Sequence, residues 1–269
     1  IGLQRDMTIV LTTTILTNPY AGLIILASVG VPEGFSVADA SVLASFMLFT
    51  HAMPVELAIS RQAGAKAIFL TIVRLMSAII FCFLIHKITN YFHIFQGAAN
   101  ISLIEFNQTS NFSGWVREQI KGLLFIQIVI IILLVFLELL KFIGFEKLIR
   151  FFMAPFLKII GIGENASTIV IVGLTIGLGF GGGLMIKEVK HGGVKERDAV
   201  NALIFINLFH SLIEDTSLVM LLGPSLLIVL FVRAIFVLIC VFLIILVLAN
   251  LPNRLFAKFI LNKKPFNNF

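Results

Sequence analysis

The sequence has few charged residues. Asp, Glu, Lys and Arg make up only 13% of its 269 residues, whereas an ordinary soluble domain has about 25%. Hydrophobic residues make up 59%, and the mean hydropathy is +1.08. A soluble domain of this length cannot bury so much apolar surface, and several apolar runs reach the roughly 20 residues that span a bilayer core. We therefore predict an all-α polytopic membrane protein surrounded by membrane lipid.

Cysteine pairs and enzyme motifs are also lacking. Cys82 and Cys240 lie inside apolar runs, and their spacing fits neither a metal site nor a redox pair. The chain contains no H-E-x-x-H, no GxxxxGK[ST] loop and no nucleophile–base arrangement. We therefore expect a protein that is not an enzyme. The net charge of +6 is small and lies in loops, which indicates membrane topology rather than nucleic-acid binding.

The chain does contain an internal duplication. A single shift of 159 positions (210 − 51) aligns residues 49–85 with residues 208–244 without a gap. The aligned polar and glycine residues are His51 with His210, Glu56 with Asp215, Gly64 with Gly223, and Arg74 with Arg233. Four matches among such rare residue types indicate a repeat rather than chance.

The duplication and the loop composition divide the chain into five parts. We predict repeat 1 with three membrane helices at 7–87, an extracytoplasmic polar loop at 88–121, a connecting membrane helix and an amphipathic helix at 122–163, repeat 2 with three membrane helices at 164–250, and a basic cytoplasmic tail at 251–269. In each repeat the first helix is broken or rich in glycine, the second carries His and acid, and the third carries Arg. We expect the second helices to run unbroken from about Asp39 to Arg61 and from Asp198 to Met220.

Loop charge predicts the orientation of these helices. With Arg5 in the cytoplasm, alternating crossings place residues 30–35 outside and nearly every basic cluster inside. If residues 148–163 cross the membrane, the two repeats are inverted; if they do not, the repeats are parallel and the basic loop 187–197 lies outside. We favour inverted-topology repeats with broken helices, an arrangement typical of secondary transporters.

Each repeat carries one acid and one Arg at matched depth. Glu56 lies 8 residues before Gly64 and Arg74 lies 10 after it, and Asp215 and Arg233 have the same offsets from Gly223. At about 1.5 Å per residue these side chains lie roughly 12–15 Å from the turn, near the bilayer centre. Charges at that depth pair with one another or line an aqueous path. Arg74 and Arg233 are therefore predicted to balance the charge of carboxylates that either hold the structure together or bind substrate or protons.

The histidines allow three interpretations. His210 and Glu214 are four residues apart and would share one helix face, whereas His51 and Glu56 are five apart. His51, His210 and Glu214 are the candidate ligands of a divalent metal ion, because imidazole suits Zn, Fe and Ni. The same residues could form a proton relay, or could only hydrogen-bond within the bundle.

The glycine run between Gly177 and Gly183 has two interpretations. Small residues let membrane helices approach closely. Alternatively the run is unwound, and its backbone at Gly179 and Gly181 lines a cavity. Asn18, followed by Pro19, occupies the corresponding place in repeat 1, and Thr12 stands nearby.

Several motifs resemble a known superfamily. F-L-K-I-I-G-I-G-E-N-A-S precedes the glycine-rich run, N-L-F-H-S-L-I-E-D-T follows it, and E-L-A-I-S-R-Q-A-G-A stands in the first half. In these the chain resembles the Gate, or nucleoside-recognition, superfamily, which includes the membrane part of bacterial ferrous iron transporters, the spore maturation proteins and regions of concentrative nucleoside transporters. The resemblance implies transport or gating through paired, inverted units. The chain lacks the cysteine of the iron transporters' Gate motif.

The sequence thus predicts a secondary transporter of the bacterial inner membrane, with a midplane site between two repeats. The predicted binding residues for a small polar solute or ion, or for a coupling proton or sodium ion, are His51, Glu56, His210, Glu214, Asp215, Thr12, Asn18, Gly179 and Gly181. Its partners would be lipid, the solute, and a second copy or a membrane partner subunit, but no nucleic acid. The alternative is a scaffold or regulatory subunit of a larger complex that transports nothing itself.

Overall fold

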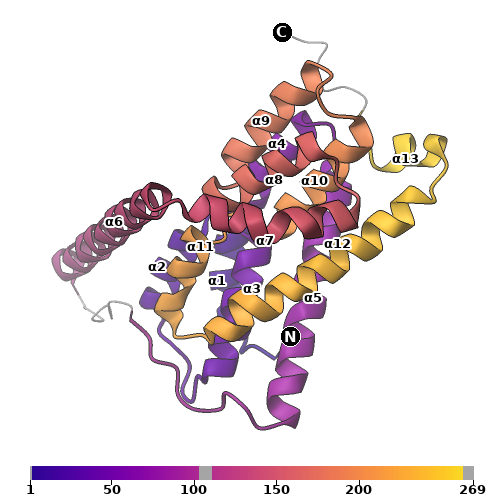
Figure 1. Cartoon of the computed structure of the whole chain (residues 1–269). Coiled ribbons are helices and arrows are strands. Elements are labelled where there is room, and N and C mark those ends of the chain that lie inside the picture. The colour runs from indigo at the N-terminus through magenta and orange to yellow at the C-terminus, as the bar shows by residue number, and fades with distance from the viewer. Residues whose placement is uncertain (1, 103–110, 263–269) are drawn as a thin grey trace.

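The computed structural model describes residues 2–102 and 111–262, which form helices and the turns between them, with no β-strand (Figure 1). Four helices are long and apolar enough to cross a membrane: Val37–Gln62, Ala67–Tyr91, Phe112–Leu140 and Leu227–Ala249. These features confirm the prediction of an all-α polytopic membrane protein. Part of the predicted polar loop, residues 103–110, and part of the predicted basic tail, residues 263–269, lie outside the described residues.

The helix boundaries repeat at the same shift as the sequence. The first repeat contains α1 (Met7–Leu16), α2 (Pro19–Val29), α3 (Val37–Thr50), α4 (Met53–Gln62) and α5 (Ala67–Tyr91). The second contains α8 (Glu164–Ile176), α9 (Leu178–Lys190), α10 (Glu196–Leu208), α11 (Glu214–Val219) with the 3-10 turn η1 (Met220–Leu222), and the π-helical η2 (Leu227–Val232) continuing into α12 (Arg233–Ala249). Adding 159 to the bounds of α3, for example, gives 196–209, against 196–208 for α10. Between the repeats lie α6 (Phe112–Phe142) and α7 (Phe145–Ile160), and α13 (Asn253–Phe259) follows them.

The first two helices of each repeat fold back on one another. Gly22 of α2 faces Thr14 of α1, and Gly181 of α9 faces Gly173 of α8. Both contacts lie four residues to either side of the break, at Asn18 in the first hairpin and at Gly177 in the second. Gly177 has φ 101°, which is not a helical value and therefore ends α8. Glycine adopts this backbone conformation readily, whereas other residues rarely do. We expected each of these runs to cross the membrane as one broken helix, but the structure turns each run back at its break.

Each hairpin therefore begins and ends at the same end of the bundle. Gly2 lies against His86 near the end of α5. Val37 N–H, just after the first hairpin, donates to Gly97 O (2.9 Å), which also follows α5. In the second repeat the Asn165 side chain at the start of α8 donates to Gly193 O (2.9 Å), just after α9. The N-terminal residues therefore lie at the same end of the bundle as residues 30–36, whereas alternating crossings predicted opposite ends for Arg5 and residues 30–35.

The two glycine turns lie at opposite ends of α5 (Figure 1). Beside the first turn, Asn262 N–H donates to Gly64 O (2.9 Å). Beside the second, Ser102 N–H donates to Leu221 O (2.8 Å). The first contact lies where α5 begins, and the second involves the chain that follows the end of α5. The 25 residues of α5 span about 37 Å, so the two ends of this helix are far apart.

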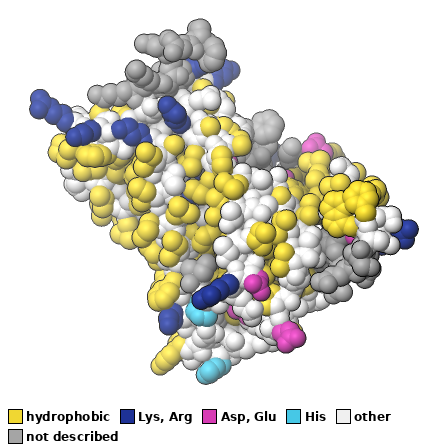
Figure 2. All heavy atoms as spheres, turned by 180° about the vertical axis from the view of Figure 1, so that it is seen from behind, with side chains coloured by type: hydrophobic (Ala, Val, Ile, Leu, Met, Phe, Trp, Pro, Cys, Tyr) yellow, Lys and Arg dark blue, Asp and Glu magenta, His cyan; other side chains and the backbone are white. Residues whose placement is uncertain are grey.

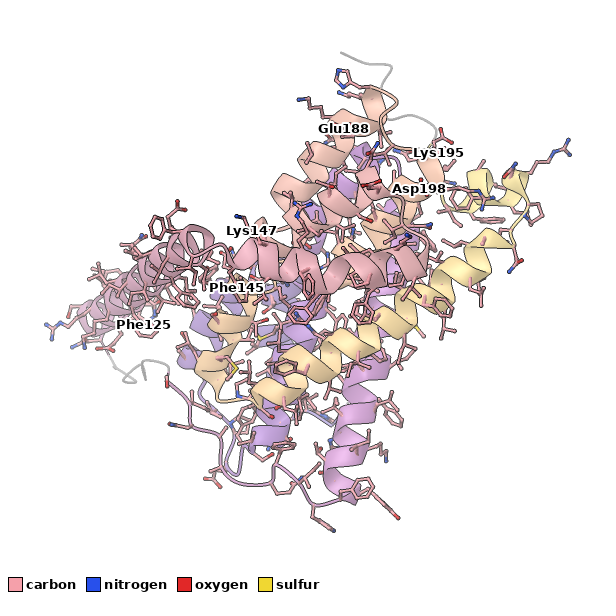
Figure 3. The ribbon with its side chains drawn as sticks, in the orientation of Figure 1. Phe125, Phe145, Lys147, Glu188, Lys195 and Asp198 are labelled. Atoms are coloured by element: carbon pink, nitrogen blue, oxygen red, sulfur yellow. The ribbon has the colours of Figure 1, made fainter. Side chains whose placement is uncertain are left out.

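Charge distinguishes the two ends. The basic end is formed by residues 61–66, 187–197 and 250–262. Arg197 joins the second segment to the third by donating to Leu251 O (3.0 Å), and Lys66 N–H joins the first to the third by donating to Ile260 O (2.7 Å). The opposite end, called the neutral end below, is formed by residues 30–36, 92–102 and 220–225, which contain no Lys or Arg, although Arg5 and Lys87 lie near it. Glu188, Lys195 and Asp198 mark the basic end in Figure 3. Several Lys and Arg side chains lie along the upper edge of the face in Figure 2, above a broad hydrophobic surface.

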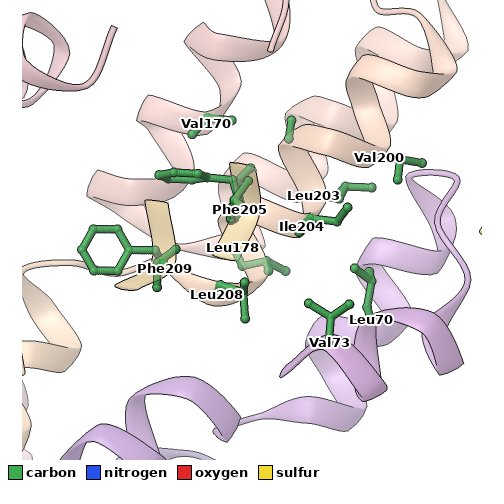
Figure 4. Packing of buried hydrophobic residues seen from close by; sticks show 14 of the residues in the cluster. Leu70, Val73, Val170, Leu178, Val200, Leu203, Ile204, Phe205, Leu208 and Phe209 are labelled. Carbon is green, nitrogen blue, oxygen red and sulfur yellow. The ribbon is translucent and has the colours of Figure 1, made fainter. Parts of the chain in front are cut away.

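Helix α10 lies at the centre of the core. It is buried almost throughout from Ala199 to Leu208, as expected for a helix that is hydrophobic on all sides. It packs against Leu70 and Val73 of α5 and against α8 and α9 of its own repeat (Figure 4). By contrast, α6 extends away from the bundle (Figure 1), and only 6% of its most apolar segment is buried.

Candidate site at the contact of the two repeats

Both histidine-bearing helices break at the histidine, although we expected them to be continuous. Ala52 has φ 49° and Ser211 has φ 45°, and these two left-handed residues occupy equivalent positions (52 + 159 = 211). Non-glycine residues adopt this conformation at a cost and cluster at functional sites. At each break a backbone N–H loses its acceptor within the helix, and the hairpin of the same repeat provides another. Ala52 N–H donates to Thr14 O (3.1 Å), and Ser211 N–H donates to Gly173 O (3.4 Å).

Each break produces two helix ends with suitable side chains. His51 caps the C-terminus of α3, and His210 follows the C-terminus of α10. Glu56 lies in the first turn of α4, and Asp215 lies in the first turn of α11. Helix C-termini favour positive charge and helix N-termini favour negative charge. The break thus stabilises the carboxylates and leaves a partial negative charge beside the imidazoles.

The outer ring nitrogen of each histidine is fixed by the backbone. His51 Nδ1 lies 3.0 Å from Met47 O, and His210 Nδ1 lies 2.9 Å from Ile206 O. A carbonyl oxygen only accepts, so each Nδ1 must carry a hydrogen and donate it. In the neutral ring this leaves the lone pair on Nε2. Both lone pairs then point into the contact between the repeats.

Four buried groups meet at that contact. The two Nε2 atoms are 2.9 Å apart. His210 Nε2 lies 2.8 Å from Glu56 Oε1, and His51 Nε2 lies 3.2 Å from Asp215 Oδ2. Each histidine therefore approaches the carboxylate of the other repeat. Such crosswise contacts are the signature of two units related by a two-fold axis.

The two arginines differ in their partners. Arg74 pairs with Glu56 through Nη1 and donates to Phe49 O and His51 O (2.8 Å each). Arg233 is only 1% exposed and lies over the Phe209 ring, 4.9 Å from its centroid. Among the described residues no carboxylate lies within ion-pair distance of Arg233, and its Nε and Nη2 have no hydrogen-bond partner. The expected second ion pair is thus not formed, because the shorter Asp215 side chain is directed to His51.

Glu214 does not lie where we expected it. Its Oε1 accepts a hydrogen bond from Tyr20 Oη (3.1 Å), and the third group beside the two histidines is Glu56 instead. The four-residue spacing of His210 and Glu214 predicts one helix face only if the helix is continuous, and the break at Ser211 removes that condition. Tyr20 itself was missed, because nothing in the sequence relates α2 to α11.

The remaining predicted residues have other surroundings. Thr12 is exposed, and the exposed Asn18 uses its Oδ1 to cap α2 by accepting from Ala21 N–H (2.9 Å). Gly179 is exposed, with open space where a Cβ would be. Gly181 packs closely on Gly173, with only 2.7 Å from an added Cβ to the Gly173 Cα. This favours the close-packing interpretation for Gly181.

Comparison with known proteins supports the membrane class. The chain is similar to a Bacillus subtilis (strain 168) protein described as "Uncharacterized membrane protein YvoD", with 27% identity over 228 residues, which is 82% of this chain and 71% of the relative. No protein-family model and no solved structure matches. The Gate resemblance therefore stays a prediction.

Proposed function

We propose that this integral membrane protein is a secondary transporter, not an enzyme, which moves a small polar solute or ion across the bacterial plasma membrane. The observation that carries the proposal is the crosswise contact of His51 and His210 with the carboxylates of Asp215 and Glu56. Ionisable groups buried in a membrane protein mark substrate, ion or proton paths.

The arrangement of the repeats supports the same function. Equivalent glycine turns lie at opposite ends of α5, which makes the repeats inverted if α5 crosses the membrane. Inverted repeats with discontinuous helices around a central site are typical of secondary transporters. The positive-inside rule then puts the basic end in the cytoplasm.

Neutralising Asp215 tests the proposal. The purified chain would be reconstituted in liposomes and screened for electrogenic currents and internal pH change with nucleosides, amino acids, carboxylates and divalent cations. We expect Asp215→Asn to abolish the flux that the wild type shows, whereas Glu33→Gln, an exposed carboxylate at the neutral end, keeps it. Wild-type flux in Asp215→Asn, or no flux by the wild type with any solute, would contradict the proposal.

A second candidate, a membrane scaffold, is favoured by the exposure of α6. Its side chains include Phe142 at 89% and Val135 at 64% exposure, a surface that either lipid or a partner helix would cover. A scaffold would retain its partner in pull-down when Asp215 is neutralised and would lose it when α6 is replaced by a polyleucine helix.

A further inference from the structure

The lone pairs that meet between the repeats face one another and would be satisfied by a shared cation. Nε2 of His51, Nε2 of His210 and Oε1 of Glu56 all lie within 4.8 Å of one another. A proton on one Nε2 can be donated to only one of the other two atoms. The remaining atom of the three would then have no proton between it and its neighbours, which lie 2.8 to 3.5 Å apart in this triangle.

A fourth donor atom near the same point also lacks a partner. Asp215 is only 6% exposed, and its Oδ2 accepts no hydrogen bond from the described residues, although it lies 3.2 Å from His51 Nε2. Buried polar atoms are nearly always satisfied, so an orphan of this kind indicates a missing ion or ligand. Its direction towards His51 places it at the edge of the same cluster.

The separations fit a common metal ion. The three edges of the His51, His210 and Glu56 triangle measure 2.9, 2.8 and 3.5 Å. Ligands bound to zinc at 2.0–2.2 Å, with angles near 90–110°, lie roughly 2.9–3.5 Å apart. The shortest edge needs to lengthen by only about 0.1 Å.

The outer contacts are those of metal ligands. Both histidines donate Nδ1–H to a backbone carbonyl, which orients Nε2 and raises its basicity. Arg74 occupies Oε2 of Glu56 and leaves Oε1 for the ion. Glu56 and Asp215 carry two negative charges; Arg74 pairs with Glu56, and the buried Arg233 lies beyond ion-pair distance of Asp215. The C-termini of α3 and α10 add partial negative charge.

From these contacts we infer that His51, His210 and Glu56 bind a divalent transition-metal ion, with Asp215 beside His51 outside this triangle. Two imidazoles and one carboxylate with an open position suit zinc, ferrous iron, cobalt or nickel, whereas magnesium and calcium require six or more oxygen ligands. The inference rests on the proposed function in one respect: it takes this metal ion to be the species that is transported.

Zinc binding tests the site directly. The purified full chain, stripped with EDTA, would be titrated with Zn²⁺ against a chromophoric chelator, with Mg²⁺ as the hard-ion control. We expect one Zn²⁺ per chain, with affinity reduced roughly 10–100-fold or more in His210→Gln. The matched control is His191→Gln, because His191 also places Nδ1 on the carbonyl four residues back (2.7 Å from Lys187 O) but is exposed. Equal zinc affinity in both variants, or displacement by equimolar Mg²⁺, would overturn the site.

A variant that retains a ligand guards against misfolding. In His210→Cys, added Co²⁺ should give a thiolate-to-metal charge-transfer band that the wild type lacks, and absence of this band would count against the site. Zinc binding without any solute flux in liposomes would refute the transport proposal and leave the site standing. Flux of another solute without zinc binding would refute the site and leave transport standing.

Discussion

At the scale of single residues, two equivalent arginines have unequal surroundings. Arg74 satisfies Glu56 and two backbone carbonyls. Among the residues that the structure describes, Arg233 lies over the face of Phe209, and its Nε and Nη2 have no hydrogen-bond partner. Removing one partner of a buried pair leaves an uncompensated charge, whereas removing an unpaired buried charge takes away a desolvation penalty. The duplication in sequence therefore does not imply equal contributions to stability.

Replacing each arginine with methionine should separate these cases. We expect Arg74→Met to lower the free energy of unfolding by about 3–5 kcal/mol, and Arg233→Met to leave it unchanged or raise it by about 1 kcal/mol. Methionine fills the space of the aliphatic stem with little strain. Thermal unfolding in detergent would measure both. Equal losses in the two variants would show that Arg233 has a stabilising partner.

At the scale of elements, the hairpins formed by α1 with α2 and by α8 with α9 depend on close helix packing. An added Cβ at Gly181 would meet the Gly173 backbone at 2.7 Å, but at Gly179 it would meet open space. We expect Gly181→Ala to destabilise the fold by about 1–3 kcal/mol through overpacking. Gly179→Ala should stabilise α9 by about 0.5–1 kcal/mol, because glycine is a poor helix former. The two unfolding midpoints should shift in opposite directions, and shifts in the same direction would count against the hairpin contact.

The sequence predicted these elements only in part. The shift that aligns His51 with His210 was visible because the unusual residues stand out among apolar ones. The return of residues 7–29 at Asn18 was not visible, because hydropathy measures length and apolarity and cannot distinguish crossing from returning. The break at Ser211 was missed because no proline or glycine marks it, and its acceptor on Gly173 comes from another helix. Because of that break, Glu214 lies against Tyr20, and Glu56 is the carboxylate beside the two histidines.

At the scale of the whole molecule, the hydrogen bonds at the two ends predict the topology. Residues 30–35 lie beside the segment after α5. Residues 189–194 are the equivalent of 30–35, and Arg197, three residues after them, donates to Leu248 O and Leu251 O. The chain that follows, at Ile260 and Asn262, is hydrogen-bonded to the start of α5. If α5 crosses the membrane, hairpins that open at opposite ends predict inverted repeats. This prediction does not depend on whether residues 148–163 cross, unlike the prediction from the sequence.

Cysteine labelling would test the inversion. In a background of Cys82→Ala and Cys240→Ala, single cysteines at Glu33 and His191 report on the two hairpin openings, and both positions are exposed. A membrane-impermeant maleimide should label Glu33→Cys in right-side-out vesicles and His191→Cys only in inside-out vesicles, because the basic end faces the cytoplasm. Labelling of both cysteines from one side would mean parallel repeats. In that case the crosswise contact of the histidines would not lie on a two-fold axis in the membrane plane, and alternating access by exchange of the two repeats would be ruled out.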